Sequence, residues 1–99
     1  GWMYDNGQGV PQDYKEAVRL YRLSAEQGNA YGQENLGYMY YTGQGVPQDY
    51  LLAHMWVNLA ASSGSKNIAR KREIVERKMT KQQIEKAQEL ARNWKPTSK

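Results

Sequence analysis

Apolar and small residues recur with the spacing of a helix face in two long segments of the chain. In the first segment they occupy positions i, i+3, i+4, i+7 and i+8, and the second segment repeats this spacing 36 positions later. Side chains spaced in this way lie on one face of a helix with about 3.6 residues per turn. We therefore predict helices over residues 13–27 and 49–63. Their predicted apolar faces are Ala17, Leu20, Tyr21, Ser24 and Ala25 in the first helix, and Ala53, Trp56, Val57, Ala60 and Ala61 in the second.

Both predicted helices have start and stop signals at their ends. Asp13, with Glu16 three residues later, is suited to cap the first helix, and Asp49 occupies the equivalent position of the second. Gly28 and Gly64 follow the last apolar positions, where a glycine commonly ends a helix. These signals indicate two separate helices joined by turns.

The segment between these helices also has helical spacing. We predict a helix over residues 29–42 and, because residues 1–6 resemble its last turns, the end of an equivalent helix at the start of the chain. Residues 7–12 and 43–48 both read GQGVPQ, which is typical of a turn. One face of the middle helix consists of Gly32, Leu36, Met39 and Tyr40, and the nearly opposite face of Tyr31, Glu34, Tyr38 and Tyr41.

Two further helices are predicted in the C-terminal third. The first spans residues 66–79, and the second spans 81–94 after a capping box formed by Thr80 and Gln83. The last helix has one apolar stripe and is polar elsewhere, as expected of a helix that closes an array. Its apolar stripe consists of Ile84, Ala87, Leu90, Ala91 and Trp94.

One block of sequence occurs twice. Residues 1–14 read GWMYDNGQGVPQDY and residues 37–50 read GYMYYTGQGVPQDY, with eleven of the fourteen positions identical. Self-similarity at this period predicts an all-α superhelical repeat, a solenoid of antiparallel helix pairs. The expected organisation is repeats over 1–64, a degenerate repeat helix over 65–79, a capping helix over 80–95 and a frayed tail over 96–99. Such arrays usually bind other proteins.

The duplicated segment resembles the Sel-one-like repeat family, a relative of the tetratricopeptide repeats. Two departures are Gly32, where the family usually has Ala, and Leu20, where the second copy has Trp56. Beyond Gly64 the Leu-Gly pair is replaced by Arg72-Glu73, so residues 65–95 resemble only the degenerate helices that close such arrays in bacteria. The matching positions are Leu36-Gly37, Met39-Tyr40, Gly43, Gly45-Val46, Asp49, Ala53, Trp56, Ala60-Ala61 and Gly64.

The resemblance implies that the first helix of each pair lines a concave face, and that the protein is a scaffold or adaptor that binds proteins or peptides. The stripe over residues 31–41 is the candidate binding surface, because exposed aromatic residues are effective anchors for a partner. The alternative is that these rings pack against the first helix of the neighbouring repeat. The candidate residues are Trp2, Asp5, Asn6, Tyr31, Glu34, Tyr38, Tyr41 and Thr42.

Charge divides the chain into two parts. Residues 1–64 contain three basic and six acidic side chains, a net of −3, whereas residues 65–99 contain eleven basic and four acidic, a net of +7. The alternative function is therefore docking of the basic part to an acidic partner, nucleic acid or an anionic surface. Pairs at i, i+4, such as Arg72–Glu76, Glu73–Arg77 and Lys81–Glu85, favour a solvated helix instead, and the scarcity of aromatic residues argues against nucleic acid. The basic candidates are Arg70, Lys71, Arg72, Arg77, Lys78 and Lys81.

Catalysis and metal binding find no support in the sequence, so we expect no enzyme, no metal site and no cofactor. The chain has no cysteine, and its one histidine, His54, lies off the apolar stripe without a second ligand. Ser63 and Lys66 match the S-x-x-K spacing of penicillin-recognising hydrolases, but Gly64 separates them and the partner motifs are missing. No apolar run approaches the roughly 20 residues needed to span a membrane. The sequence favours neither a cytoplasmic nor a periplasmic location.

The chain begins inside the repeated block. We therefore expect it to be the C-terminal part of a longer protein. Because single repeats do not bury their apolar faces, we also expect either preceding repeats or self-association through the face around Trp2, Met3 and Val10.

Overall fold

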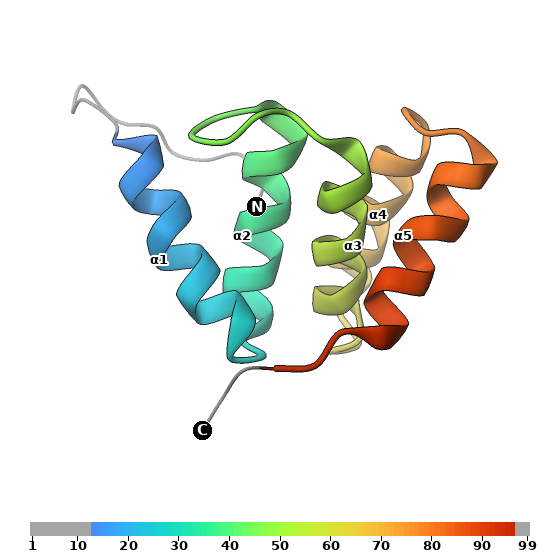
Figure 1. Cartoon of the computed structure of the whole chain (residues 1–99). Coiled ribbons are helices and arrows are strands. Elements are labelled where there is room, and N and C mark those ends of the chain that lie inside the picture. The colour runs from blue at the N-terminus through green and yellow to red at the C-terminus, as the bar shows by residue number, and fades with distance from the viewer. Residues whose placement is uncertain (1–12, 97–99) are drawn as a thin grey trace.

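The computed structural model describes residues 13–96. These residues form five α-helices and no strand (Figure 1). The helix predicted near residues 1–6, the turn at 7–12 and the tail residues 97–99 lie outside the described part. The other five predicted helices are confirmed, with ends that differ by up to three residues. They are α1 (Tyr14–Glu26), α2 (Ala30–Thr42), α3 (Tyr50–Ala61), α4 (Lys66–Glu76) and α5 (Lys81–Asn93).

Each helix begins at a side chain that caps it. The capping oxygen accepts a hydrogen bond from a backbone N–H of the first turn, which otherwise has no partner inside the helix. The predicted caps at Asp13 and Asp49 are confirmed, and so is the capping box of Thr80 and Gln83. The five caps are Asp13, Asn29, Asp49, Ser65 and Thr80.

Two glycines predicted to end helices have the expected backbone conformation. Gly28 and Gly64 both have φ of 94°, in the left-handed region that side chains with a Cβ rarely enter. Gly45, in the turn before α3, has φ of 78°, and a Cβ there would lie only 2.5 Å from the carbonyl oxygen of Tyr14. The turns of the repeat therefore depend on glycine for conformation and for space.

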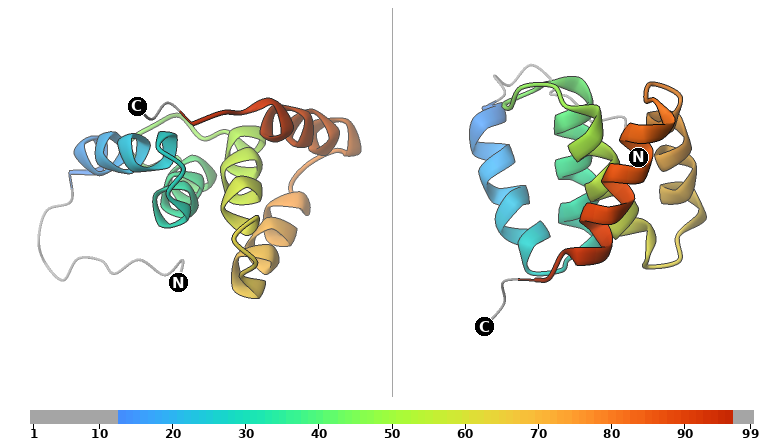
Figure 2. Two further views of the ribbon diagram at one scale, coloured as in Figure 1. Left: turned by 90° about the horizontal axis from the view of Figure 1, so that it is seen from below. Right: turned by 45° about the vertical axis from the view of Figure 1, so that its right-hand side comes forward.

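The helices form two rows with α3 between them. Figure 2 (left) shows α2 and α4 on one side of the molecule and α1 and α5 on the other. α2 packs against α1 and α3, and α3 packs against α2, α4 and α5. The first helices of successive pairs, α2 and α4, thus share one side of a helical repeat solenoid, while α5 closes the other side of α3.

α3 is buried on nearly all sides because three helices surround it. Toward α2 the backbones approach closely, since a Cβ at Gly37 would lie 2.6 Å from Val57 Cγ2 and 3.2 Å from the carbonyl oxygen of Ala53. Toward α5, Trp56 is 5 % exposed and meets the ring of Trp94 edge-on, with 5.8 Å between ring centroids. A helix covered on every side needs apolar residues on every side, and α3 has them.

The predicted apolar face of α1 is wrong at one position. Leu20 was placed on the inner face, but it is 50 % exposed, and Leu23 is 49 % exposed beside it. The buried positions are Val18 and Ala25, which lie on the side toward α2. Leu20 corresponds to Trp56, whose side of α3 is covered by α5. In the described residues no helix covers the same side of α1.

Candidate functional site

The outward side of α2 presents four residues at helical spacing, which we call the α2 face: Tyr31, Asn35, Tyr38 and Thr42. Tyr31 is 68 % exposed, Tyr38 is half-buried and Thr42 is exposed. The opposite side of α2 is closed, because its core residues are less than a tenth exposed. Among residues 13–96, the α2 face is therefore the side of this helix that stays at least partly exposed.

Two hydrogen bonds hold the polar residues of the α2 face against the helix. The Nδ2 of Asn35 donates to the carbonyl oxygen of Tyr31 at 2.9 Å. The hydroxyl of Thr42 donates to the carbonyl oxygen of Tyr38 at 3.1 Å. Both bonds are formed with the residue four positions earlier, so the short polar side chains stay close to the backbone. Of the two tyrosine rings on this face, that of Tyr31 is exposed and that of Tyr38 is half-buried.

The aromatic residues of the predicted stripe divide between exposed and packed positions. Tyr31 meets Tyr21 of α1 edge-on, with ring centroids 6.4 Å apart, and remains mostly exposed. Tyr41 turns instead toward the start of α3, where its ring centroid lies 5.5 Å from that of Tyr50. The ring of Tyr41 thus packs at the junction between α2 and α3, the second helix of its own pair, and not against the first helix of the neighbouring repeat.

Glu34 connects α2 to α4. Its Oε2 accepts a hydrogen bond from Nζ of Lys71, and the two side chains are only 17 % and 14 % exposed. A pair this sheltered is weakly screened by solvent, and loss of either partner would leave a poorly hydrated charge. Glu34 and Lys71 therefore link α2 to α4 through an ion pair.

The structure brings together part of the predicted binding surface. Tyr31, Tyr38 and Thr42 share the α2 face, whereas Glu34 and Tyr41 turn toward neighbouring helices. Sequence reasoning missed Asn35, although it follows Tyr31 by four residues and precedes Tyr38 by three. The predicted continuation through Trp2, Asp5 and Asn6 lies outside the described residues, as does the N-terminal face around Trp2, Met3 and Val10.

The predicted basic cluster also divides. Lys71 binds Glu34, and Nη1 of Arg72 donates to Oδ1 of Asn58 on α3 at 2.8 Å. These two cations hold α4 to the helices beside it. The remaining four are exposed and form no ion pair within residues 13–96: Arg70, Arg77, Lys78 and Lys81.

The ion pairs predicted along the C-terminal helices do not form in the described residues. Arg72 binds Asn58 and Glu76 binds His54, so both residues of one predicted pair are engaged by α3. The pairs Glu73–Arg77 and Lys81–Glu85 are also absent from the ion pairs of residues 13–96. Partners on a packed neighbouring helix displace a solvated i, i+4 pair, which stabilises a helix by only about 0.2–0.5 kcal/mol.

His54 is buried, contrary to the expectation that it lies off the packed face. It is fully inaccessible, and its Nε2 lies 2.8 Å from Oε2 of Glu76, which is 31 % exposed. Its Nδ1 is buried without a hydrogen-bond partner. The geometry fits an Nε2–H that donates to the carboxylate. No group of three or more His, Cys, Asp or Glu side chains that could hold a metal ion occurs among residues 13–96.

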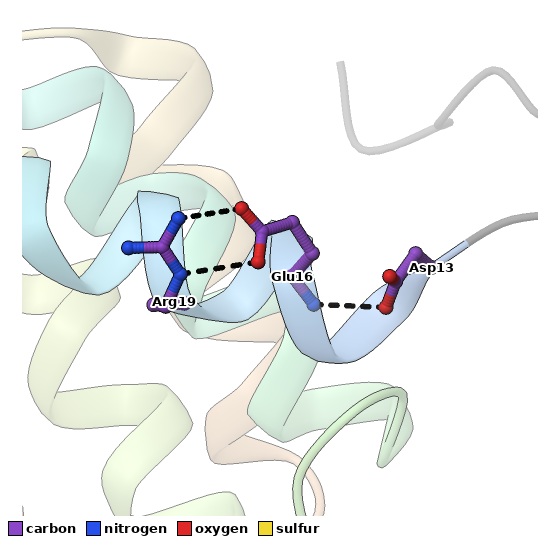
Figure 3. Close-up of polar contacts among 3 residues, drawn as sticks. All are labelled: Asp13, Glu16 and Arg19. Atoms are coloured by element: carbon purple, nitrogen blue, oxygen red, sulfur yellow. Dashed lines mark hydrogen bonds and ion pairs between the residues drawn. The ribbon is translucent and has the colours of Figure 1, made fainter.

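The exposed first turn of α1 contains a separate ion pair, shown in Figure 3. Nε and Nη2 of Arg19 lie 3.1 and 2.5 Å from the two carboxylate oxygens of Glu16. The hydrogen bond from Arg19 lowers the pKa of Glu16 below its ordinary value, and the same contact raises the pKa of Arg19. Because both side chains are well exposed, the pair stabilises the helix end only weakly.

The S-x-x-K residues lie on different elements. Ser63 follows the end of α3 and Lys66 begins α4, with Gly64 in a left-handed conformation between them. A nucleophile and a base on one helical turn are therefore not available at this position. Within residues 13–96, none of the helices has the length and apolar character that crossing a membrane requires.

Comparisons with known proteins agree with this architecture. A sequence model of the Sel1 repeat matches residues 1–29 and 30–65. The crystal structure of c5321, a protective antigen present in uropathogenic Escherichia coli strains and displaying an SLR fold, is similar with a TM-score of 0.80 and 35 % identity. The match covers 89 % of this chain and 19 % of the antigen, so this chain spans about a fifth of the longer protein. No curated protein sequence matches the chain.

The boundary between the two matched segments, after residue 29, coincides with the start of α2. The first ends in the turn between α1 and α2, and the second includes α2, α3 and the turn after them. Proteins built from Sel1 repeats generally serve as protein-interaction scaffolds. The duplicated block, the helix pairs and the match over residues 1–65 show that the chain belongs to the Sel1 repeat family.

Proposed function

We propose that this chain binds another protein or a peptide through the α2 face, without catalysing a reaction. One observation supports this assignment most directly: Tyr31 is 68 % exposed on a helix whose other sides are packed. A tyrosine in this position presents a large apolar ring and a hydroxyl to the same partner. Such residues are enriched among those that dominate binding energy.

The surroundings of Tyr31 favour a preformed site. Its ring and that of Tyr21 meet at an interplanar angle of 80° with centroids 6.4 Å apart, and we expect this contact to restrict the Tyr31 ring before a partner binds. Restricting a side chain in advance lowers the entropy lost on binding, about 0.5–1.5 kcal/mol for each immobilised side chain. Tyr38 packs partly against the core and is expected to be held in the same way.

The helix behind the face is held rigidly. A Cβ at Gly32 would lie 2.6 Å from Cβ of Ser24, and one at Gly37 would lie 2.6 Å from Cγ2 of Val57. These distances are shorter than any ordinary contact, so α2 lies as close to α1 and α3 as glycine permits. We expect a partner to meet a surface that changes little on binding.

Peptide display with counter-selection tests the proposal. Random peptides of about twelve residues are selected on the full chain and counter-selected on the Tyr31→Ala, Tyr38→Ser double variant. We expect selected peptides to bind the double variant at least about tenfold more weakly, a loss near 1.4 kcal/mol. Fluorescence anisotropy measures the affinities, and circular dichroism establishes that the variant is folded.

The matched control is Leu20→Ala with Leu23→Ala. These two side chains are about half exposed, but they lie on the side of α1 that faces away from α2. We expect this control to bind the selected peptides with unchanged affinity. Equal binding by the tyrosine double variant, or an equal loss in the leucine control, would contradict the proposal.

A further inference from the structure

The repeat places a second set of residues in register with the α2 face. Positions 36 residues later form what we call the α4 face, and they differ in chemistry from their α2 counterparts. Ile74 corresponds to Tyr38 and is 41 % exposed, and Lys78 corresponds to Thr42 and is exposed. The complete α4 face is Asn67, Lys71, Ile74 and Lys78.

The two faces adjoin on the same side of the molecule. Figure 2 (left) shows α2 and α4 on the same side of the molecule with α3 between them, and the Glu34–Lys71 ion pair joins the two helices. Tyr31 and Ile74 are two of the four large hydrophobic side chains that are exposed in residues 13–96. The α2 and α4 faces therefore form one surface, the α2–α4 surface, with tyrosines on one helix and an exposed isoleucine on the other.

Unpaired positive charge lies on the α4 face at Lys78 and just beside this face at Arg70, about one turn before Ile74, and at Arg77, one residue before Lys78. Arg70, Arg77 and Lys78 are exposed and form no ion pair among the described residues. The acidic groups nearby are largely engaged, because Glu34 binds Lys71 and Glu76 binds His54. Only Glu73 remains as an exposed, unpaired carboxylate of α4.

From this arrangement we infer that the partner of the α2–α4 surface is an acidic peptide segment with apolar residues between its carboxylates. Its apolar side chains would contact Tyr31, Tyr38 and Ile74, and its carboxylates would face Arg70 and Lys78. This inference rests on the proposed function and adds the chemistry of the partner. Complementary charge raises association rates and orients an encounter, while the apolar contacts supply most of the affinity.

A nucleic acid fits this surface less well than a peptide. Tight binding to a phosphate backbone uses several cations that follow the strand, and single-strand binding adds aromatic rings beside them. On the α2–α4 surface the exposed cations lie on α4 and in the turn after it, while the tyrosines lie on α2. The exposed carboxylate of Glu73 also repels phosphate.

The test uses three fluorescein-labelled peptides of about twelve residues and one oligonucleotide. The acidic peptide alternates Glu with Leu, the neutral peptide replaces every Glu by Gln, and the basic peptide replaces every Glu by Lys. A thymidine oligonucleotide of the same length is the fourth probe. We expect the full chain to bind the acidic peptide at least about tenfold more tightly than the neutral peptide, with affinity that falls as salt is raised.

Charge reversal locates the site. The double variant Arg70→Glu, Lys78→Glu should bind the acidic peptide at least about tenfold more weakly than wild type does. It should bind the basic peptide more tightly than wild type does. The matched control is Lys86→Glu with Lys95→Glu, which changes net charge equally at exposed positions in and just after α5. We expect this control to leave both affinities within about twofold of wild type.

Several outcomes would overturn the inference: equal binding of acidic and neutral peptides, equal effects of the two charge reversals, or tighter binding of the oligonucleotide. A different result would contradict the proposed function itself. If Tyr31→Ala with Tyr38→Ser leaves display-selected peptides bound, the α2 face is not the site. If selected peptides depend on the tyrosines but respond neither to Glu→Gln replacement nor to reversal at Arg70 and Lys78, only the acidic partner is ruled out.

Discussion

Two interfaces at equivalent positions of the repeat use different chemistry. Between α1 and α2, Val18 is 5 % exposed and the guanidinium of Arg22 donates to the hydroxyl of Tyr40 at 2.9 Å. Between α3 and α4, the residue equivalent to Val18 is His54, and the residue equivalent to Tyr40 is Glu76. The first interface therefore contains a buried aliphatic side chain and a hydrogen bond between a guanidinium and a hydroxyl, and the second buries an imidazole against a carboxylate.

The difference shows which properties the repeat fixes and which it leaves free. The caps at Asp13 and Asp49 and the left-handed glycines Gly28 and Gly64 that follow α1 and α3 are the same in both copies, so the backbone brings equivalent positions together. The side chains at the contact are free to change if every buried polar group keeps a partner. In the second interface one group does not, since Nδ1 of His54 is unpartnered. The second interface is thus the one more sensitive to loss of a single residue.

The largest expected effect comes from placing a histidine in the α1–α2 interface at the position that His54 occupies in the α3–α4 interface. Val18→His places an imidazole where no carboxylate lies opposite, and space is limited because Val18 Cγ2 lies 2.9 Å from where a Cβ of Gly45 would be. Overpacking and an unpaired buried polar group together should cost about 3 kcal/mol of unfolding free energy. Urea unfolding followed by circular dichroism measures the change.

The control for this prediction places the same residue on the exposed side of the same helix. Leu20→His should change the unfolding free energy by less than about 1 kcal/mol, because Leu20 is half exposed. If both histidine variants lose similar stability, helix propensity rather than burial explains the result. If Val18→His is tolerated, the first interface has more room than the structure shows.

The second prediction removes the acid from the second interface. Glu76→Ala leaves His54 fully buried with neither ring nitrogen paired. An unsatisfied buried donor costs about 1–3 kcal/mol, so we expect a loss near 2 kcal/mol in the same urea measurement. The matched control is Glu73→Ala, an exposed acid of the same helix without an ion pair in the described residues, and it should lose far less.

The third prediction makes the second interface resemble the first. His54→Val copies the equivalent residue Val18, removes the unpartnered nitrogen and leaves a carboxylate that is already 31 % exposed and can be hydrated. The lost volume offsets part of this gain, so the unfolding free energy should change by no more than about 1 kcal/mol. A loss as large as that of Glu76→Ala would show that the ion pair itself stabilises the interface.

The local features of the fold could be predicted from sequence because they depend on a few neighbouring residues. Asp13 and Asp49 cap helices in the structure, and Gly28 and Gly64 end them, since each signal acts within one turn. Burial could not be predicted in the same way. Leu20 is exposed although its spacing matches a packed face, because burial depends on whether another helix lies opposite.

At His54 and at the candidate site, too, burial and contacts could not be predicted from the sequence. His54 was placed off the packed face, but α3 has helices on three sides and therefore no free side at that position. The tyrosine stripe was predicted as one surface, yet Tyr41 packs on Tyr50 and Glu34 binds Lys71, partners that only the folded chain brings near. Tyr31 and Tyr38 remain together because they lie on the side of α2 that none of the helices α1 to α5 covers.

The smallest expected effect concerns the exposed ion pair of α1, which contrasts with the buried pair of the second interface. Its contact with Arg19 lowers the pKa of Glu16, so the pair stabilises the folded chain above the unfolded-state pKa of Glu16 and loses this effect as pH falls through the lowered folded-state pKa. Glu16→Gln should therefore reduce stability slightly at neutral pH and not at all in strong acid. Thermal unfolding across the acid range measures the difference, with Glu85→Gln as the control at an exposed acid of α5. A difference between Glu16→Gln and wild type that persists unchanged into acid would mean that the pair acts through helix propensity rather than charge.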